Sequence, residues 1–194
     1  HLVLSSVALA AGDPVLAERE ARAALGAGGA QVAPLLAVAR AQWAQEKAAD
    51  ALATLDQAEK DLDLVTTSEK TFPGLFLLRG DILSATDRRR EGSEAYKREI
   101  DAYPDFPWAY ARLARVYAAL GRRTQGLDVV RQMIATNPDD PAIYRTAVQV
   151  LRAMRDFPQA DQVARIAASR FPDDPSVQAL ADRGRPIREE DLLP

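Results

Sequence analysis

The sequence has no cysteine, a single histidine and few aromatic residues. A chain without cysteine forms no disulfide and offers no thiolate ligand to a metal ion. The one histidine, His1, stands at the end of the chain, so the chain alone cannot assemble a Ser-His-Asp triad. Glycine-rich phosphate-binding motifs of the Walker or GxGxxG type are also missing. These absences predict a protein that is not an enzyme and that binds neither a metal ion nor a cofactor.

The sequence also lacks a basic excess and a long apolar run. Its net charge is -3 and its isoelectric point is about 5.3, whereas nucleic-acid-binding proteins usually carry a clear positive excess. No apolar run approaches the roughly 20 residues that a membrane-spanning helix needs. We therefore expect neither a nucleic-acid partner nor a membrane span in this chain, and we leave the compartment open between cytoplasm and periplasm.

Several short polar or glycine-rich clusters have structural explanations. Asp139-Asp140 and Asp173-Asp174 are adjacent pairs after a proline, a position typical of helix caps and not of an opposed catalytic pair. The glycines at 26–29 indicate a helix end and not a nucleotide-binding loop. The arginines at 88–90 indicate a solvated turn and not a nucleic-acid site. The acidic residues at 189–191 indicate a solvated tail, with an acidic docking segment as the alternative.

The chain begins with His1 and not with methionine, so we expect a fragment or a processed chain. The apolar stretch Leu2 to Ala11 has the composition of the end of a secretory signal. We interpret it as a helix, because it lies in register with the repeats described below and no basic segment precedes it.

Alanine and leucine are plentiful and β-branched runs are scarce, which favours helices throughout. Asp13-Pro14, Asp140-Pro141 and Asp174-Pro175 each pair an N-cap acceptor with a proline suited to the first helical position. Pro73, Pro107 and Pro158 are assigned the same role. The predicted helices are 2–11, 14–25, 32–45, 48–64, 73–86, 90–102, 107–120, 124–136, 141–154, 158–170 and 175–183.

Fixed spacing shows that these helices form repeats. Pro104, Pro138 and Pro172 lie 34 residues apart. A small residue recurs at one place in the second helix of each pair, with an insertion of seven residues near 65–72 that keeps the helical phase. These small residues are Ala17, Ala51, Gly92, Gly126 and Ala160. Because one helix pair cannot bury its apolar face alone, neighbouring pairs are expected to stack with a continuous core.

The stretch 107–140 carries the best-preserved unit, and its pattern residues are Tyr110, Leu113, Ala114, Tyr117, Gly126, Val130 and Pro138. This pattern resembles the tetratricopeptide repeat (TPR) family. The unit at 73–106 departs from it at Arg79, where leucine is usual. A looser likeness of the alanine-rich N-terminal part is to TPR proteins of bacterial exopolysaccharide and cell-envelope systems.

The resemblance implies an all-α, right-handed superhelical solenoid. We expect units at about 1–31, 32–65, 73–106, 107–140 and 141–174, a capping helix at 175–183 and a tail at 184–194. In that family the first helix of each pair lines a concave groove that binds a protein or peptide segment. The predicted partner-binding residues are Arg40, Trp43, Asp81, Trp108, Arg112, Arg115, Arg145, Gln149 and Arg152.

The arginines near Trp108 suit an acidic or C-terminal peptide segment, because guanidinium groups pair with carboxylates and tryptophan provides an amphipathic anchor. The alternative is that the arginines only solvate a helix face or pair with neighbouring carboxylates. The predicted function is a non-catalytic protein-protein interaction scaffold. The alternatives are a spacer within a larger bacterial secretion or exopolysaccharide-system protein, and a regulatory domain of an enzyme. Self-association is left open.

Overall fold

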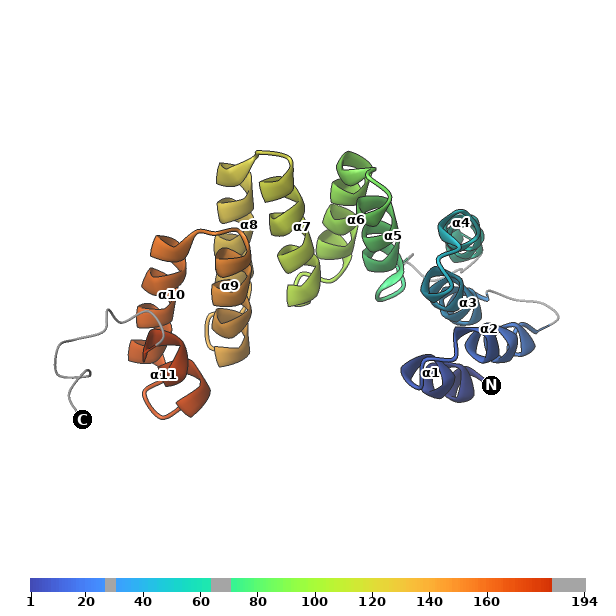
Figure 1. Ribbon diagram of the computed structural model, residues 1–194, viewed down its shortest axis with the longest axis horizontal. Coiled ribbons are helices and arrows are strands. Elements are labelled where there is room, and N and C mark those ends of the chain that lie inside the picture. The colour runs from blue at the N-terminus through green and yellow to red at the C-terminus, as the bar shows by residue number, and fades with distance from the viewer. Residues whose placement is uncertain (27–30, 64–70, 183–194) are drawn as a thin grey trace. The chain divides into compact units, whose positions relative to one another are not determined.

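The protein is an all-α repeat solenoid in the computed structural model, which describes residues 1–26, 31–63 and 71–182. Eleven helices lie in this described part, arranged as antiparallel pairs (Figure 1). They are α1 (Leu2–Ala10), α2 (Pro14–Ala23), α3 (Val32–Ala44), α4 (Ala48–Asp63), α5 (Leu75–Ala85), α6 (Arg89–Ala102), α7 (Pro107–Ala119), α8 (Arg123–Thr136), α9 (Pro141–Ala153), α10 (Phe157–Arg170) and α11 (Pro175–Asp182). The predicted all-helical fold is confirmed, and each helix begins and ends within two residues of the predicted range.

Three predicted features lie wholly or mostly outside the described residues. These are the glycine cluster beyond Gly26, the insertion at 65–70 and the tail at 184–194 with its acidic residues at 189–191.

Aspartate caps start several helices, as the Asp-Pro pairs predict. A side-chain oxygen of Asp13 accepts a hydrogen bond from the Leu16 N–H of α2 at 2.9 Å, and Asp140 accepts one from the Ala142 N–H of α9 at 2.8 Å. The prediction for Pro73 was wrong. Gly74 adopts a left-handed conformation with φ of 84°, so α5 begins only at Leu75.

The arginines at 88–90 are all exposed, but only Arg88 stands before a helix, since α6 begins at Arg89. Arg88 forms an ion pair with Glu91 at 2.6 Å, and Arg89 pairs with Asp87. The hydrogen bond from Arg88 holds the pKa of Glu91 below its usual range.

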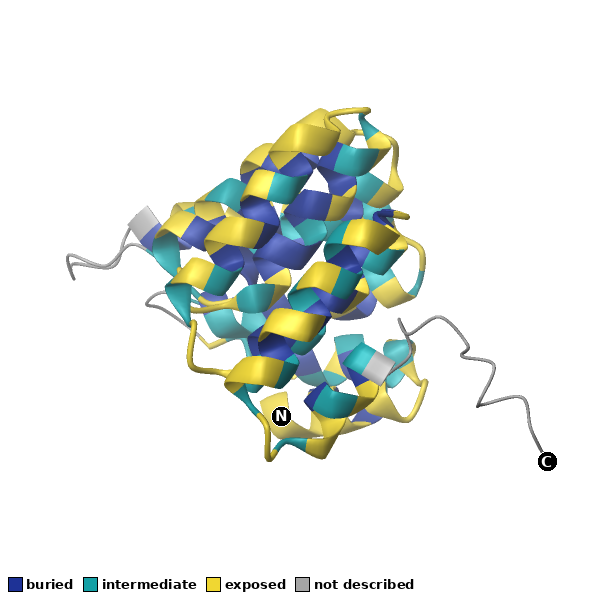
Figure 2. Cartoon of the chain, turned by 90° about the vertical axis from the view of Figure 1, so that its left-hand side faces the viewer, coloured by how far each residue is buried: buried dark blue, intermediate teal, exposed yellow. Residues whose placement is uncertain are grey.

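The chain divides into two compact units, residues 1–102 and 103–194. Within the first unit, α1 packs on α2, α3 on α4 and α5 on α6, while α3 also contacts α1 and α5. Within the second unit, α7 packs on α8, α9 on α10, and α9 also contacts α7 and α11. Buried positions therefore run as stripes along each helix, with exposed positions on its other side (Figure 2).

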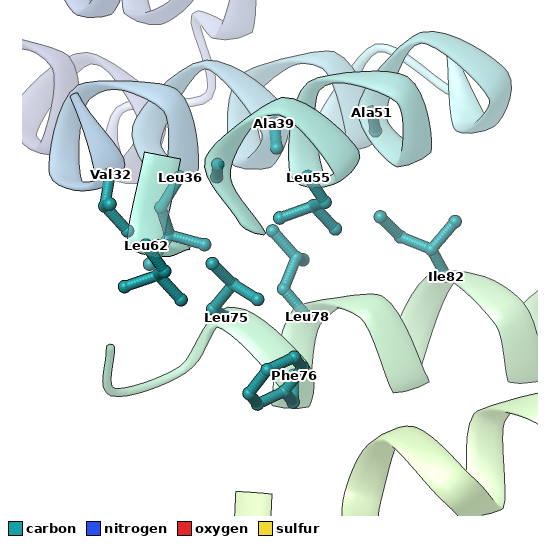
Figure 3. Packing of buried hydrophobic residues seen from close by; sticks show 11 residues of the cluster. Val32, Leu36, Ala39, Ala51, Leu55, Leu62, Leu75, Phe76, Leu78 and Ile82 are labelled. Carbon is teal, nitrogen blue, oxygen red and sulfur yellow. The ribbon is translucent and has the colours of Figure 1, made fainter. Parts of the chain in front are cut away.

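The main apolar cluster of the first unit joins α3, α4 and α5 (Figure 3). Leu55, Leu75 and Ile82 are completely buried there. Each such side chain contributes about 1.5–3 kcal/mol through the apolar surface removed from water. Arg79, which stands where leucine is usual in the resembled family, forms ion pairs with Asp56 at 2.7 Å and Glu59 of α4 at 3.3 Å.

The helices α5 and α6 approach closely because two glycines face each other across them. A Cβ atom on Gly92 would lie 3.0 Å from the carbonyl oxygen of Gly80. A Cβ on Gly80 would overlap the ring of Tyr96, which is buried. The alanines at the same repeat position, Ala17, Ala51 and Ala160, are completely buried. The small residues repeated along the sequence are therefore the places where paired helices touch.

Glu99 is a feature that the repeat pattern did not predict. This glutamate of α6 is completely buried, and its carboxylate accepts hydrogen bonds from the backbone N–H groups of Gly74, Phe76 and Leu77 at 2.6, 3.1 and 3.2 Å. A buried carboxylate is costly unless it is hydrogen-bonded, and the first N–H groups of a helix need acceptors. Glu99 meets both needs by capping α5 from the neighbouring helix.

We expect Gly80→Ala to lower the free energy of unfolding by about 1–2 kcal/mol. Because three atoms of the Tyr96 ring would lie within 2.9 Å of the added Cβ, the collision costs about 2–3 kcal/mol, the upper part of the range for overpacking, and this outweighs the helix propensity of about 1 kcal/mol gained by alanine. Urea titration followed by circular dichroism measures the change. In a Tyr96→Leu background, the same substitution should be neutral or stabilising. A more stable Gly80→Ala protein in the Tyr96 background would contradict this account.

We expect Glu99→Ala to destabilise the first unit by at least about 2 kcal/mol, because several buried N–H groups lose their acceptor. Hydrogen exchange should accelerate at the amides of Gly74, Phe76 and Leu77. The control is Glu94→Ala on the same helix, where an exposed ion pair with Lys97 is worth at most about 1 kcal/mol. Equal effects of the two substitutions would show that Glu99 is not a cap.

Candidate interaction surface

The helices α7 and α9 present most of the predicted partner-binding residues. Tyr110, Leu113 and Tyr117 form the buried stripe of α7. Trp108, at the second helical position, is followed four and seven residues later by arginines, and residues at this spacing share one face of a helix. Since α7 and α9 pack against each other in the second unit, their side chains contribute to a common surface.

On α7, the exposure of the side chains decides what a partner could contact. Trp108 is 55% exposed, which is unusual for so large an apolar side chain. Arg115 is exposed and forms no hydrogen bond or ion pair within the described residues. Arg112 is half-buried and is engaged by the protein itself. Trp108 and Arg115 are therefore the two side chains of α7 most available to a partner.

On α9, the three predicted residues differ in their contacts. Gln149 is exposed. The Arg145 guanidinium donates to the Ser176 hydroxyl at 2.7 Å and lies 3.5 Å from the Asp174 carboxylate, and Arg152 donates to the carbonyl oxygen of Leu180 at 3.2 Å. Both arginines thus hold α11 against α9. The ion pair of Arg145 with Asp174 is the alternative considered from the sequence, pairing with a neighbouring carboxylate, whereas the bond from Arg152 to a backbone carbonyl was not considered there.

Asp174 is the centre of these contacts at the start of α11. The hydrogen bond from the Ser176 hydroxyl, the backbone N–H groups of Val177 and Ser176, and the positive charge of Arg145 together hold the pKa of Asp174 below its usual range. The carboxylate therefore stays ionised and caps α11, as the Asp-Pro pattern predicts.

The other three predicted residues lie in the first unit. Arg40 is exposed on α3. Trp43 is half-buried and packs against the apolar cluster of α3, α4 and α5. Asp81 is half-buried on α5 and accepts a hydrogen bond from the Tyr96 hydroxyl at 2.8 Å.

Four of the first helices, α1, α3, α7 and α9, contain no aspartate or glutamate, whereas the first helix α5 carries both Arg79 and Asp81. Together α7 and α9 contain four arginines and no aspartate or glutamate. Likewise α1 has no charged residue, and α3 has only Arg40. The carboxylates gather on the second helices, above all on α4 and α6. A chain with a negative net charge therefore presents a positive surface on α7 and α9, which would attract an acidic segment.

Two features of possible binding surfaces were missed from the sequence. Phe106, the residue before α7, is 42% exposed close to Trp108 in the chain, and the aromatic residues on both sides of Pro107 were the available signal. A pocket between α1, α3 and the turn before α5 has no signal in the sequence, because it depends on how two helices and this turn pack together.

Two other kinds of site are absent from the described residues. No three His, Cys, Asp or Glu side chains gather there in the way a metal ion requires. In the same part of the chain, each helix is too short or too polar to cross a lipid bilayer.

Comparison with known proteins bears on the repeat pattern. Residues 107–150 match the family model described as tetratricopeptide repeat. No curated protein sequence matches the chain significantly.

Solved structures resemble the fold at low sequence identity. MamA has a TM-score of 0.60 and 19% identity, covering 87% of this chain and 95% of its own. A thermophilic TPR protein of Thermus thermophilus has a TM-score of 0.56 and 18% identity, covering 94% and 96%. YrrB, described as a TPR protein with an unusual peptide-binding site, has a TM-score of 0.56 and 12% identity, covering 94% and 90%.

The family match falls on the unit whose pattern is best preserved in the sequence, and the structural matches extend the same fold over most of the chain. The resemblance predicted from Tyr110, Gly126 and Pro138 is confirmed. The chain has the fold of TPR solenoids and carries tetratricopeptide repeat sequence at residues 107–150.

Proposed function

We propose that the protein is a non-catalytic interaction scaffold whose second unit binds an acidic segment of a partner protein on α7 and α9. The observation that carries this proposal is the charge of these two neighbouring helices, which have arginines and no carboxylate. Exposed Trp108 stands on the same surface.

Each group has a distinct role in the proposed complex. Arg115, which has no partner within the described residues, would pair with a carboxylate of the bound segment. Trp108 would bury its exposed ring against the partner, because large aromatic side chains lose little conformational freedom on binding and dominate many interfaces. Gln149 would add hydrogen bonds from α9.

Arg145 and Arg152 would contribute differently from Arg115. They already hold α11, so their main contribution would be the positive potential of the surface and the position of α9. A guanidinium group has several N–H donors, so Arg145 can bind Ser176 and still face a partner carboxylate. YrrB, which shares the fold, is described as having a peptide-binding site, and this supports a peptide as the ligand class.

We expect an acidic peptide to bind this surface and to alter the fluorescence of Trp108. The sequence has two tryptophans, so Trp43→Phe leaves Trp108 as the single reporter. The probe is the end-blocked peptide Glu-Ser-Glu-Tyr-Glu-Ser-Glu. Arg115→Glu should weaken its binding at least tenfold, or about 1.4 kcal/mol, because a guanidinium-carboxylate contact becomes a repulsion.

The matched control is Arg165→Glu, which reverses an exposed arginine on the second helix α10 and changes the net charge equally. Its affinity for the peptide should stay close to that of the unsubstituted protein. If both reversals weakened binding alike, attraction would come from net charge and not from α7 and α9. If neither did, the proposed surface would be wrong.

A further inference from the structure

The first unit contains a pocket of about 510 Å³ between α1, α3 and the turn that precedes α5. Its walls are mostly apolar and include Leu2 and Leu9 of α1, Leu36 of α3, and Phe72. Ser5 and Ser6 add two hydroxyl groups. This volume lies within the range of roughly 300–1,000 Å³ that is typical of ligand pockets.

Among the described residues that line this pocket, Arg40 is the one with a charged side chain. It is exposed and forms no hydrogen bond or ion pair within the described residues. Its guanidinium lies beside the backbone turn at Gly74, since a Cβ atom there would stand 2.9 Å from Nη2 of Arg40. The positive charge therefore stands at the edge of the apolar pocket, next to the start of α5.

Within residues 1–26, 31–63 and 71–182, no carboxylate forms an ion pair or hydrogen bond with Arg40. The helices α1 and α3 contain no aspartate or glutamate. The carboxylate of Glu99, which contacts the turn at Gly74, accepts hydrogen bonds from the backbone N–H groups of Gly74, Phe76 and Leu77. The backbone N–H groups at the start of α5 thereby have an acceptor, and the N–H donors of the Arg40 guanidinium remain available to another anion.

We infer that this pocket anchors a partner protein through an aliphatic side chain next to an acidic side chain. The aliphatic group would displace water from Leu2, Leu9 and Leu36, and the carboxylate would pair with Arg40 at the pocket edge. The inference rests on the proposed function only in that the partner is a protein. The site belongs to the first unit and its ligand chemistry differs from that of α7 and α9.

The test uses the end-blocked peptide Ser-Gly-Leu-Leu-Glu-Gly-Ser labelled with a dansyl group, which has no carboxylate, so that the single carboxylate of the probe is the glutamate side chain. Fluorescence anisotropy should show saturable binding, and amide NMR shifts should change on α1 and α3. Arg40→Gln should weaken binding about tenfold by removing the charge while keeping a long polar side chain. Ser6→Leu, which fills the pocket from α1, should abolish it.

Matched controls separate the pocket from general effects. Arg90→Gln removes an exposed arginine of the same unit, and Ser169→Leu adds a leucine at an exposed position of α10. The two control variants should bind the peptide with the same affinity as the unsubstituted protein. A peptide with glutamine in place of glutamate should bind about as weakly as the unchanged peptide binds Arg40→Gln, since both lose the same contact.

The inference is overturned if the peptide does not bind, if Arg40→Gln or Ser6→Leu binds it normally, or if decanoate binds the pocket and the peptide does not. Arg115→Glu distinguishes this result from the proposed function. Loss of Leu-Leu-Glu binding in Arg40→Gln but not in Arg115→Glu supports the pocket even if α7 and α9 bind no acidic peptide. Loss of Leu-Leu-Glu binding in Arg115→Glu but not in Arg40→Gln would place the peptide on α7 and α9 and would contradict the pocket.

Discussion

Close contact between paired helices at one small residue per repeat is the constraint on which the structure depends. At Gly80 and Gly92 the helices α5 and α6 approach until an added Cβ would meet a backbone carbonyl or the ring of Tyr96. Alanine serves the same purpose at Ala51 and Ala160, which are completely buried. Because this approach orients each helix pair, it also determines which face of the first helix remains for solvent or a partner.

Buried charge is placed where it stabilises the backbone. The Glu99 carboxylate caps the start of α5 from α6, so the irregular turn at Gly74 is held without a side-chain cap of its own. At the start of α11, Asp174 and Arg145 form a side-chain network that holds this helix on α9. Because Arg145 already bonds within the protein, a charged residue on the first helix of a pair is not by that fact a binding residue.

The two candidate surfaces differ in chemistry although both are positive. On α7 and α9, arginines occur together with an exposed tryptophan and no carboxylate, the chemistry from which we propose an acidic segment as ligand. In the first unit, Arg40 stands alone at the edge of an apolar pocket and favours one carboxylate beside an aliphatic group. A scaffold with two distinct anchors could bind two features of one partner or two partners, and effective concentration would then raise the overall affinity.

The sequence by itself determined the helices, the Asp-Pro starts of α2, α9 and α11, and the small residue at one position of each repeat, because these depend on local propensity and on spacing. It also placed Trp108 and Arg115 on one helical face. Only the tertiary structure decided that Glu99 caps α5, that Arg145 and Arg152 hold α11, and that Arg40 borders a pocket. Those outcomes depend on atoms brought together from different helices, and no local pattern encodes such distances.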